Sequence, residues 1–560
     1  MRLLVRHTYL WIKKRRINRF LAAAPRCREI QQRVLLKKIR RNADSDFGRD
    51  HGFATIRSSA EFQRRVPVAG YEYYRPYIER VKQGEMHALF GPTTKVLMFS
   101  MTSGTTSASK YIPITNHFYG EYRKSWNLWG LGVFRDHTDL LTKRTIQLSS
   151  DWRQFFTDSG IPCGNVSGLA AETRPRIARP AFILPPVVSK ISGSVNKQYV
   201  VLRLMVPISR IGMMVTANPL TLLNVARLAD SRRESLVRDI QDGTLTDDIE
   251  IPDHVRKSLE PALKQRHPKR ARELESIIER TGHFYPRDFW PLMSVLSVWI
   301  GGSMGIYLPM VREYYGNASF RDHGLSASEG RMTTPLKDGT SAGVLDYVTH
   351  YFEFIPEEEH DHDNPTVLEA HELQPGENYF ILLTTSSGLY RYDIHDVVKC
   401  VGFAGACPVL DFMNKGAHYS SMAGEKISES QVATSIASAF ADLGLAVEHS
   451  TLAPVADAPP HYTLLTELRL PPRQARQLAQ RIDLHLSRAN CEFEDRLASF
   501  RLNPTTVRRV DDGTFAALRE HRVSGRGGSA EQYKHPWLVN QTDFVDQLLK
   551  LKRPVRPVCV

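Results

Sequence analysis

A hydroxyl-rich loop in the first quarter of the chain carries residue types that bind phosphate. Met98–Thr115 reads MFSMTSGTTSASKYIPIT, with a glycine among serines and threonines and a lysine after them. Gly104 lets the backbone bend toward a ligand, and Lys110 adds a cation. Hydroxyl donors come from Thr102, Ser103, Thr105 and Thr106. The alternative interpretation is a surface turn of small polar residues.

This loop is not a Walker A motif. That motif needs GxxxxGK[ST], with its lysine opening a helix whose N-terminus faces phosphate. No second glycine lies between Gly104 and Lys110, and Tyr111 follows the lysine. Pro113 and the alternation of KYIPIT favour a strand. We therefore expect a strand at Val96–Met101, a phosphate-binding loop and a second strand.

Two carboxylates farther along the chain suit a nucleotide site. Glu329 stands in GLSASEG, Gly324–Gly330, among small residues that leave room for a ligand. A carboxylate there can hold Mg²⁺ together with substrate phosphates. Asp396, in GLYRYDIHDVV, follows an expected strand and can accept hydrogen bonds from ribose hydroxyls. The alternatives are a helix-entry glutamate and a turn aspartate.

The elements that must position these residues indicate an α/β fold. Short apolar runs alternate with helical patterns through the first 400 residues. Tyr379–Thr385 predicts a buried strand, and a strand-like LYRYDI follows a turn at 386–388. One helix face carries an aromatic stripe that favours core packing, formed by Tyr119, Tyr122, Trp126 and Trp129.

The last third of the chain predicts a small α+β domain. A capping box at Ser428 and Gln431 opens a helix that Gly444 ends. A long helix is expected after Pro471, and strands at Leu445–Leu452, Tyr462–Leu470 and Thr506–Val510. We place a hinge at residues 412–416, between domains at 1–411 and 417–560.

Composition excludes several classes of protein. The 560 residues carry a formal charge of +14 spread along the chain, and no nucleic-acid module accompanies it. The longest uncharged stretch of the basic N-terminus, His7–Ile12, is too short to span a membrane, so we favour a solvated first helix over a basic arm that touches a membrane. Six cysteines without a CxxC pair indicate free thiols and a cytoplasmic protein. The stretch EEEHDHD, Glu357–Asp363, favours a solvated loop over a metal site.

Seven segments together resemble one enzyme family. They are NADSDFGRDHGF (42–53), YRPYIERVKQGE (74–85), TSGTTSASKYIPIT (102–115), YFEFIP (351–356), GLYRYDIHDVV (388–398), GEKISESQV (424–432) and EQYKHP (531–536). The chain is similar over nearly its whole length to the adenylate-forming superfamily. Within it, the chain resembles a bacterial-type member of the Gretchen Hagen three family, the auxin-responsive acyl-acid amido synthetases.

The resemblance implies a fold and a set of site residues. It implies a large N-terminal adenylation domain of α/β subdomains and a small mobile C-terminal α+β domain. Ser103, Gly104, Thr105 and Thr106 resemble the family's phosphate loop, and Ser328 and Glu329 fall where the family contacts the α-phosphate and the metal. Asp396 matches the ribose-binding aspartate. Lys534, in QYKHP, resembles the lysine that reaches the α-phosphate; the alternative is an exposed surface lysine.

The resemblance also implies a reaction. A carboxylic acid attacks Mg·ATP to give acyl-AMP and pyrophosphate, and an amine, expected to be an amino acid, takes the acyl group. Lys110, Lys534 and Glu329 are the expected catalytic residues. The alternatives are transfer to coenzyme A and a non-catalytic nucleotide-binding protein. Leu325, Asp393 and His395 depart from the family's aromatic, arginine and glycine residues, and the acid, the amine and the oligomeric state stay open.

Overall fold

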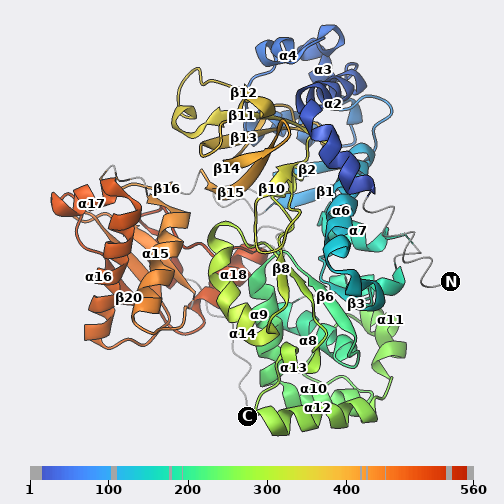
Figure 1. Cartoon of the computed structure of the whole chain (residues 1–560), viewed down its shortest axis with the longest axis vertical. Coiled ribbons are helices and arrows are strands. Elements are labelled where there is room, and N and C mark those ends of the chain that lie inside the picture. Colours follow the sequence, from blue (N-terminus) through green and yellow to red (C-terminus); the bar gives the residue numbers. More distant parts are fainter. Residues whose placement is uncertain are drawn as a thin grey trace. The chain divides into compact units, whose positions relative to one another are not determined.

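The computed structural model describes residues 15–102, 110–175, 179–191, 193–416, 419–423, 425, 427–447, 449–524 and 533–550. The chain divides into two compact units, and Figure 1 colours it along the sequence from blue at the N-terminus to red at the C-terminus. The larger unit contains most of the chain up to Phe412. The smaller unit contains the chain from Met413 onward, together with two short segments from earlier in the sequence. The hinge predicted at 412–416 stays a prediction.

The two strands predicted on either side of the hydroxyl-rich loop are confirmed. Strands β1 (Val96–Thr102) and β2 (Lys110–Thr115) pair antiparallel, with Thr102 opposite Lys110. Residues 103–109, which include the predicted phosphate-binding Ser103, Gly104, Thr105 and Thr106, lie outside the described residues. The hairpin belongs to a sheet of order β2-β1-β5-β4, with β5 at Pro162–Gly164 and β4 at Phe155–Phe156.

A parallel sheet is the second sheet of the larger unit. Its strands, in spatial order, are β3 (Arg144–Gln147), β6 (Ile211–Val215), β7 (Val295–Ser297) and β8 (Ser319–Arg321). Every residue of β6 is buried, as expected for a parallel strand between helices. The helices around it include α8 (Ser194–Met205), α9 (Pro219–Ser231), α10 (Arg233–Asp242), α11 (Asp253–Leu263), α12 (Pro268–Thr281), α13 (Pro286–Phe289) and α14 (Leu308–Tyr315).

Helix α6 (Asn116–Asp136) carries the aromatic stripe. The Thr115 hydroxyl caps it by accepting from the amide of Phe118. Along the stripe the rings of Trp126 and Trp129 meet edge to face, with centroids 5.0 Å apart, and Trp129 is buried. The stripe packs within the larger unit, as the sequence predicted. The remaining helices of this unit are α2 (Cys27–Arg41), α3 (Asp46–Asp50), α4 (Ser59–Arg65), α5 (Tyr71–Lys82) and α7 (Val166–Glu172).

A seven-stranded sheet carries the third predicted segment. Its order is β12 (Leu368–Glu369), β11 (Tyr351–Pro356), β13 (Asn378–Thr384), β14 (Tyr392–Ala404), β15 (Cys407–Lys415), β10 (Gly343–Leu345) and β9 (Thr333–Thr334). The strand predicted at Tyr379–Thr385 is confirmed. The strand predicted in LYRYDI begins only at Tyr392, because the Thr385 amide bonds back to Leu389 and Arg391 has a left-handed φ of 48°.

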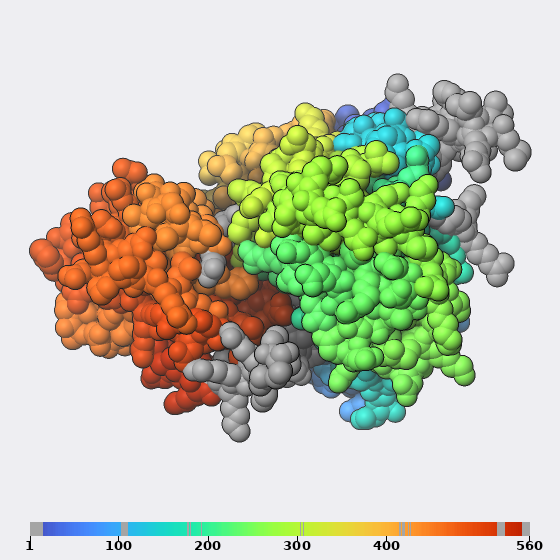
Figure 2. All heavy atoms as spheres, turned by 90° about the horizontal axis from the view of Figure 1, so that it is seen from below, coloured from blue at the N-terminus to red at the C-terminus, as the bar shows by residue number. Residues whose placement is uncertain are grey.

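The smaller unit is the predicted α+β arrangement, and Figure 2 shows one face of its later part in orange to red spheres. Its sheet has the order β18 (Ser450–Val455), β19 (His461–Thr466) and β20 (Thr506–Arg509). A short pair, β16 (Tyr419–Ser420) and β17 (Ile427–Ser428), precedes the helices. They are α15 (Glu429–Asp442), α16 (Pro472–Ala489), α17 (Cys491–Ala498), α18 (Thr514–Ser524) and α19 (Phe544–Leu549).

Local signals in this unit mostly gave the right elements. The capping box of Ser428 and Gln431 is formed, and Gly444, with φ 64°, follows the helix end. The strand predicted at Leu445–Leu452 is wrong in position. The Leu445 amide bonds to the Phe440 carbonyl and so completes the helix cap, and the strand starts at Ser450.

Two further expectations meet the structure. Among the described cysteines none is in a disulfide, and Cys27, Cys163, Cys400 and Cys407 are buried, as predicted for free thiols. In the part of the chain that the structure describes, no helix has both the length and the apolar content needed to cross a membrane. Residues 1–14 lie outside the described residues, and residues 15–23 are helical.

Candidate active site

Glu329 stands at the tip of a tight hairpin. Ser326 and Arg331 pair across it, and the amide of Ala327 donates to the carbonyl of Gly330 at 2.9 Å. The hairpin depends on Gly324, whose φ is 86° and where a side chain would collide with the Thr333 carbonyl. The Glu329 side chain is buried, with its residue only 4% exposed. The small residues that predicted room for a ligand therefore build the turn that carries the carboxylate.

The neighbouring Ser328 joins this hairpin to strand β1. The Ser100 hydroxyl donates to the Ser328 hydroxyl at 2.9 Å, and Ser100 is fully buried. Ser100 lies two residues before Thr102, where the described part of β1 ends. The bond therefore places the Ser328–Glu329 hairpin next to the base of the hydroxyl-rich loop.

Lys110 and Glu329 both interact with a buried tyrosine on β14, Lys110 by a hydrogen bond and Glu329 through its charge. The Lys110 ammonium donates to the hydroxyl of Tyr392 at 3.4 Å and lies 5.7 Å from the ring centroid of Tyr71. Burial raises the pKa of Tyr392 well above its usual value, and the Glu329 carboxylate raises it further. Tyr392 thus keeps its proton at neutral pH and lies within electrostatic reach of the carboxylate. Lys110, Glu329 and Tyr392 come from the three segments that the sequence predicted to bind one nucleotide.

Burial also raises the pKa of Tyr71, to about 12. Its hydroxyl accepts from the Tyr111 amide at 2.9 Å, which fixes α5 against β2 beside Lys110. Ammonium, carboxylate and neutral hydroxyl groups in one place can bind polyphosphate oxygens and a hard divalent cation. The arrangement suits charge stabilisation at phosphorus.

The entrance to β14 is held by a buried ion pair. The Arg391 guanidinium Nε lies 3.1 Å and 3.2 Å from the two carboxylate oxygens of Glu353 on β11, and both side chains are buried. The other end of Arg391 donates to the carbonyls of Gln63 and Val66 at 3.0 Å and 2.8 Å. Asp396 lies four residues beyond Tyr392 on this strand and is buried. The pair therefore fixes the strand that presents both residues.

Lys534 lies in the smaller unit, on a segment docked along β18. The Leu452 amide donates to the Trp537 carbonyl at 2.8 Å, and the Val539 amide donates back to Leu452 at 3.1 Å. The neighbours of Lys534, Tyr533 and His535, are buried, whereas Lys534 itself is exposed. The alternation points the lysine outward from a firmly anchored segment.

The structure describes only some of the site residues that the sequence predicted. The structure gathers Lys110, Ser328 and Glu329 in the larger unit. Thr102 ends β1, and its side chain is not among the described ones. Sequence reasoning missed Ser100, Tyr71 and Tyr392; only the short alternation of LYRYDI marked one of them.

Three models of the GH3 family match most of the chain. The GH3 family N-terminal domain matches residues 16–320, the central domain residues 343–415 and the C-terminal domain residues 430–543. Indole-3-acetic acid-amido synthetase GH3.3 of Arabidopsis thaliana is 23% identical over 551 residues, covering 93% of this chain and 90% of the relative. Indole-3-acetic acid-amido synthetase GH3.8 of Oryza sativa subsp. indica is 25% identical, covering 93% and 89%.

Solved structures share the fold. The GH3.15 acyl acid amido synthetase superposes with a TM-score of 0.84 at 20% identity, covering 96% of each chain. The AtGH3.15 acyl acid amido synthetase in complex with 2,4-DB superposes with a TM-score of 0.83 at 20% identity, covering 95% of each chain. The α/β fold class predicted from the sequence is confirmed. That the chain is of bacterial type stays a prediction. Since the domain models cover well over half of its residues, the chain belongs to the GH3 family, as the resemblance of its motifs predicted.

Proposed function

We propose that this chain is an ATP-dependent acyl-acid amido synthetase. It converts a carboxylic acid and ATP to an acyl adenylate and pyrophosphate, and then transfers the acyl group to an amine, for which an amino acid is the first candidate. The observation that carries the proposal is that Lys110, at the base of the hydroxyl-rich loop, bonds to Tyr392, on which the Glu329 carboxylate also acts electrostatically. Membership of the GH3 family supports it.

ATP is a substrate in this reaction, and each proposed contact uses one group. Hydroxyls and amides of residues 102–106 and the Ser328 hydroxyl bind phosphate oxygens, and the Asp396 carboxylate accepts from the ribose. Glu329 offers a buried carboxylate oxygen beside hydroxyl groups, the donor set that Mg²⁺ prefers, so the site fits that ion. When bound, Mg²⁺ would neutralise phosphate charge.

The two proposed steps need no enzyme nucleophile. First, a carboxylate oxygen of the acid bonds to the α-phosphorus, and the bond from that phosphorus to pyrophosphate breaks. Second, the amine nitrogen bonds to the acyl carbon, AMP leaves with the bridging oxygen, and the amine loses a proton. Lys110 and the loop donors stabilise the negative charge that grows at phosphorus. The protein supplies placement and charge, in keeping with the groups present.

The domain assignment is part of the proposal. An adenylation domain spans residues 1–411, residues 412–416 act as a hinge, and residues 417–560 form a cap that presents Lys534 for the first step and withdraws it for the second. Residues up to Lys415 belong to strand β15, and Gly416 follows it. A turn about Asn414 and Lys415 therefore needs the end of that strand to release.

The test is acid-dependent exchange of pyrophosphate into ATP. The panel of acids begins with indole-3-acetic acid and 2,4-DB, which appear in the names of the relatives, and extends to aliphatic and aromatic acids. We expect exchange with at least one acid, and an amide when amino acids are added. A thioester with coenzyme A and no amide would favour the ligase alternative. Exchange with no acid would favour a nucleotide-binding protein. We likewise propose a cytoplasmic location.

A further inference from the structure

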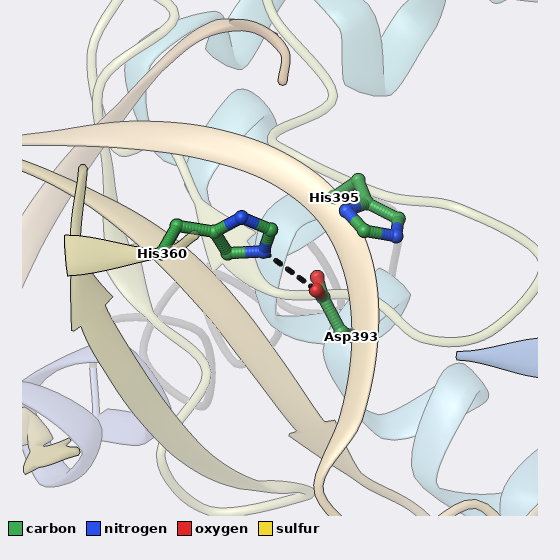
Figure 3. Close-up of side chains that lie close together, drawn as sticks. All are labelled: His360, Asp393 and His395. Atoms are coloured by element: carbon green, nitrogen blue, oxygen red, sulfur yellow. Dashed lines mark hydrogen bonds and ion pairs between the residues drawn. The ribbon is translucent and has the colours of Figure 1, made fainter. Parts of the chain in front are cut away.

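A histidine, an aspartate and a second histidine lie close together at the seven-stranded sheet. One ligand atom from each of His360, Asp393 and His395 lies within 4.8 Å of the others (Figure 3). Asp393 and His395 are two residues apart on β14, and His360 bonds directly to Asp393. The local chain and this bond therefore set the geometry of the group.

His360 is held toward the sheet. It follows β11 and the short 3-10 turn Glu357–Glu359, and its Nε2–H donates to the Asp393 carboxylate at 2.7 Å. Its ring stacks on Phe380 of β13, with centroids 3.6 Å apart and planes 20° apart. The side chain is only 16% exposed. The three residues after it, Asp361, His362 and Asp363, are exposed. The expectation of a solvated loop is therefore correct for these three residues but not for His360.

The backbone of His395 is strained. Its φ of 58° lies in the left-handed region, which residues other than glycine rarely adopt. Asp393 and His395 are alternate residues of one strand, and Asp393 is buried. Such strain persists where surrounding structure holds it and concentrates at ligand sites. Here it accompanies an imidazole with a nitrogen within 4.8 Å of two other ligand groups.

We propose that His360, Asp393 and His395 form a binding site for a first-row transition-metal cation, with Zn²⁺ the expected occupant. Two imidazoles and a carboxylate form a ligand set that suits Zn²⁺, Co²⁺ or Ni²⁺, whereas Mg²⁺ and Ca²⁺ prefer oxygen ligands throughout. Three protein ligands leave a fourth position for water or a substrate group. The site goes beyond the proposed amide synthesis, whose cation is assigned to Glu329.

The present geometry requires little movement for binding. With metal–ligand bonds of about 2.0–2.2 Å, ligand atoms of a tetrahedral site stand roughly 3.4 Å apart. The pair His360 and Asp393 is closer than that and the group as a whole spans no more than 4.8 Å. The cation takes the place of the proton that His360 now shares with Asp393. It would also tie the loop of residues 357–363 to the strand that carries Asp396.

The test uses the full-length chain without a histidine tag, freed of metal by a chelator. Titration with Co²⁺ should give the intense visible absorption of tetrahedral cobalt, saturating at one equivalent, and Zn²⁺ should abolish it in the presence of excess Mg²⁺. Loss of the outer partners of a metal ligand weakens binding by about 10–100-fold, so removing a ligand should weaken it by at least that factor. His360→Ala and His395→Gly should therefore lose the absorption.

Two variants make the result decisive. His395→Gly suits the left-handed backbone, so it should fold even if His360→Ala does not. His362→Ala removes an exposed histidine from the same loop and should bind Co²⁺ as the wild type does. A wild type with no tetrahedral cobalt signal would overturn the proposal. So would a His395→Gly chain that binds cobalt as tightly as the wild type, or a His362→Ala chain that loses the signal.

Discussion

Replacing Glu353 with glutamine tests the buried ion pair at the entrance to β14. The substitution keeps the shape of the side chain but leaves the Arg391 cation next to a neutral amide, with both side chains less than a tenth exposed. The amide oxygen of the new glutamine can still accept one hydrogen bond from Arg391 Nε. Its amide NH₂ replaces the second carboxylate oxygen, so a donor then faces the Arg391 donor. Glu353 belongs to the motif YFEFIP and Arg391 to GLYRYDIHDVV, so the ion pair joins the two motifs.

The magnitude follows from what Arg391 retains. Breaking a buried pair by removing one partner costs about 3–5 kcal/mol. Arg391 keeps the carbonyls of Gln63 and Val66 at 3.0 Å and 2.8 Å, so we expect a loss near the lower end, about 3 kcal/mol. With an m-value of about 3 kcal/mol per M, the urea midpoint of the larger unit falls by about 1 M.

The assay is urea unfolding followed by tryptophan fluorescence, and the control is Glu72→Gln. Glu72 pairs with Arg75 at 2.6 Å on the surface, with exposed fractions of 70% and 37%, so its loss should matter little. After Arg391→Met, adding Glu353→Gln should cost much less, since no buried cation is then left. If Glu353→Gln shifts the midpoint no more than the control does, the pair does not stabilise the sheet.

Three further outcomes are expected. Glu329→Gln lowers the rate of ATP–pyrophosphate exchange by about 10²–10³ without unfolding the chain, and near-normal exchange would contradict its role. Lys534→Ala slows exchange by a similar factor, while transfer to the amine from added acyl adenylate continues; an unchanged exchange rate would count against the assignment. Burial raises the pKa of Asp322 to about 7, so the folded chain holds a proton that the unfolded chain releases above a pH of about 4. The free energy of unfolding of the wild type should therefore fall between pH 4 and 7, by up to about 4 kcal/mol relative to Asp322→Asn, in urea titrations across pH; parallel pH profiles would refute this.

Local signals allowed prediction of the elements. The alternation around Pro113 placed β2, and the Ser428 capping box placed the start of α15, because each depends on neighbours within a few residues. The strand after Gly444 was misplaced since the helix cap continues through Leu445, which an apolar run does not reveal.

The contacts of the candidate site had no such signal. Lys110 meets Tyr392 across 282 positions of the chain, and Glu353 meets Arg391 across 38. Neither periodicity nor composition links such pairs; only the folded sheets bring them together. His360 shows the same limit, because its acidic neighbours predicted a solvated loop and its stacking on Phe380 could not be seen.

Isotope transfer tests the central claim most directly. An acid that supports exchange is labelled with ¹⁸O in its carboxylate and incubated with the chain, ATP, Mg²⁺ and the amine, and AMP is analysed by mass spectrometry. Attack of the carboxylate on the α-phosphorus predicts that AMP gains one ¹⁸O for each amide formed. Amide formation with unlabelled AMP would contradict the account, because the acid would then have been activated by another route.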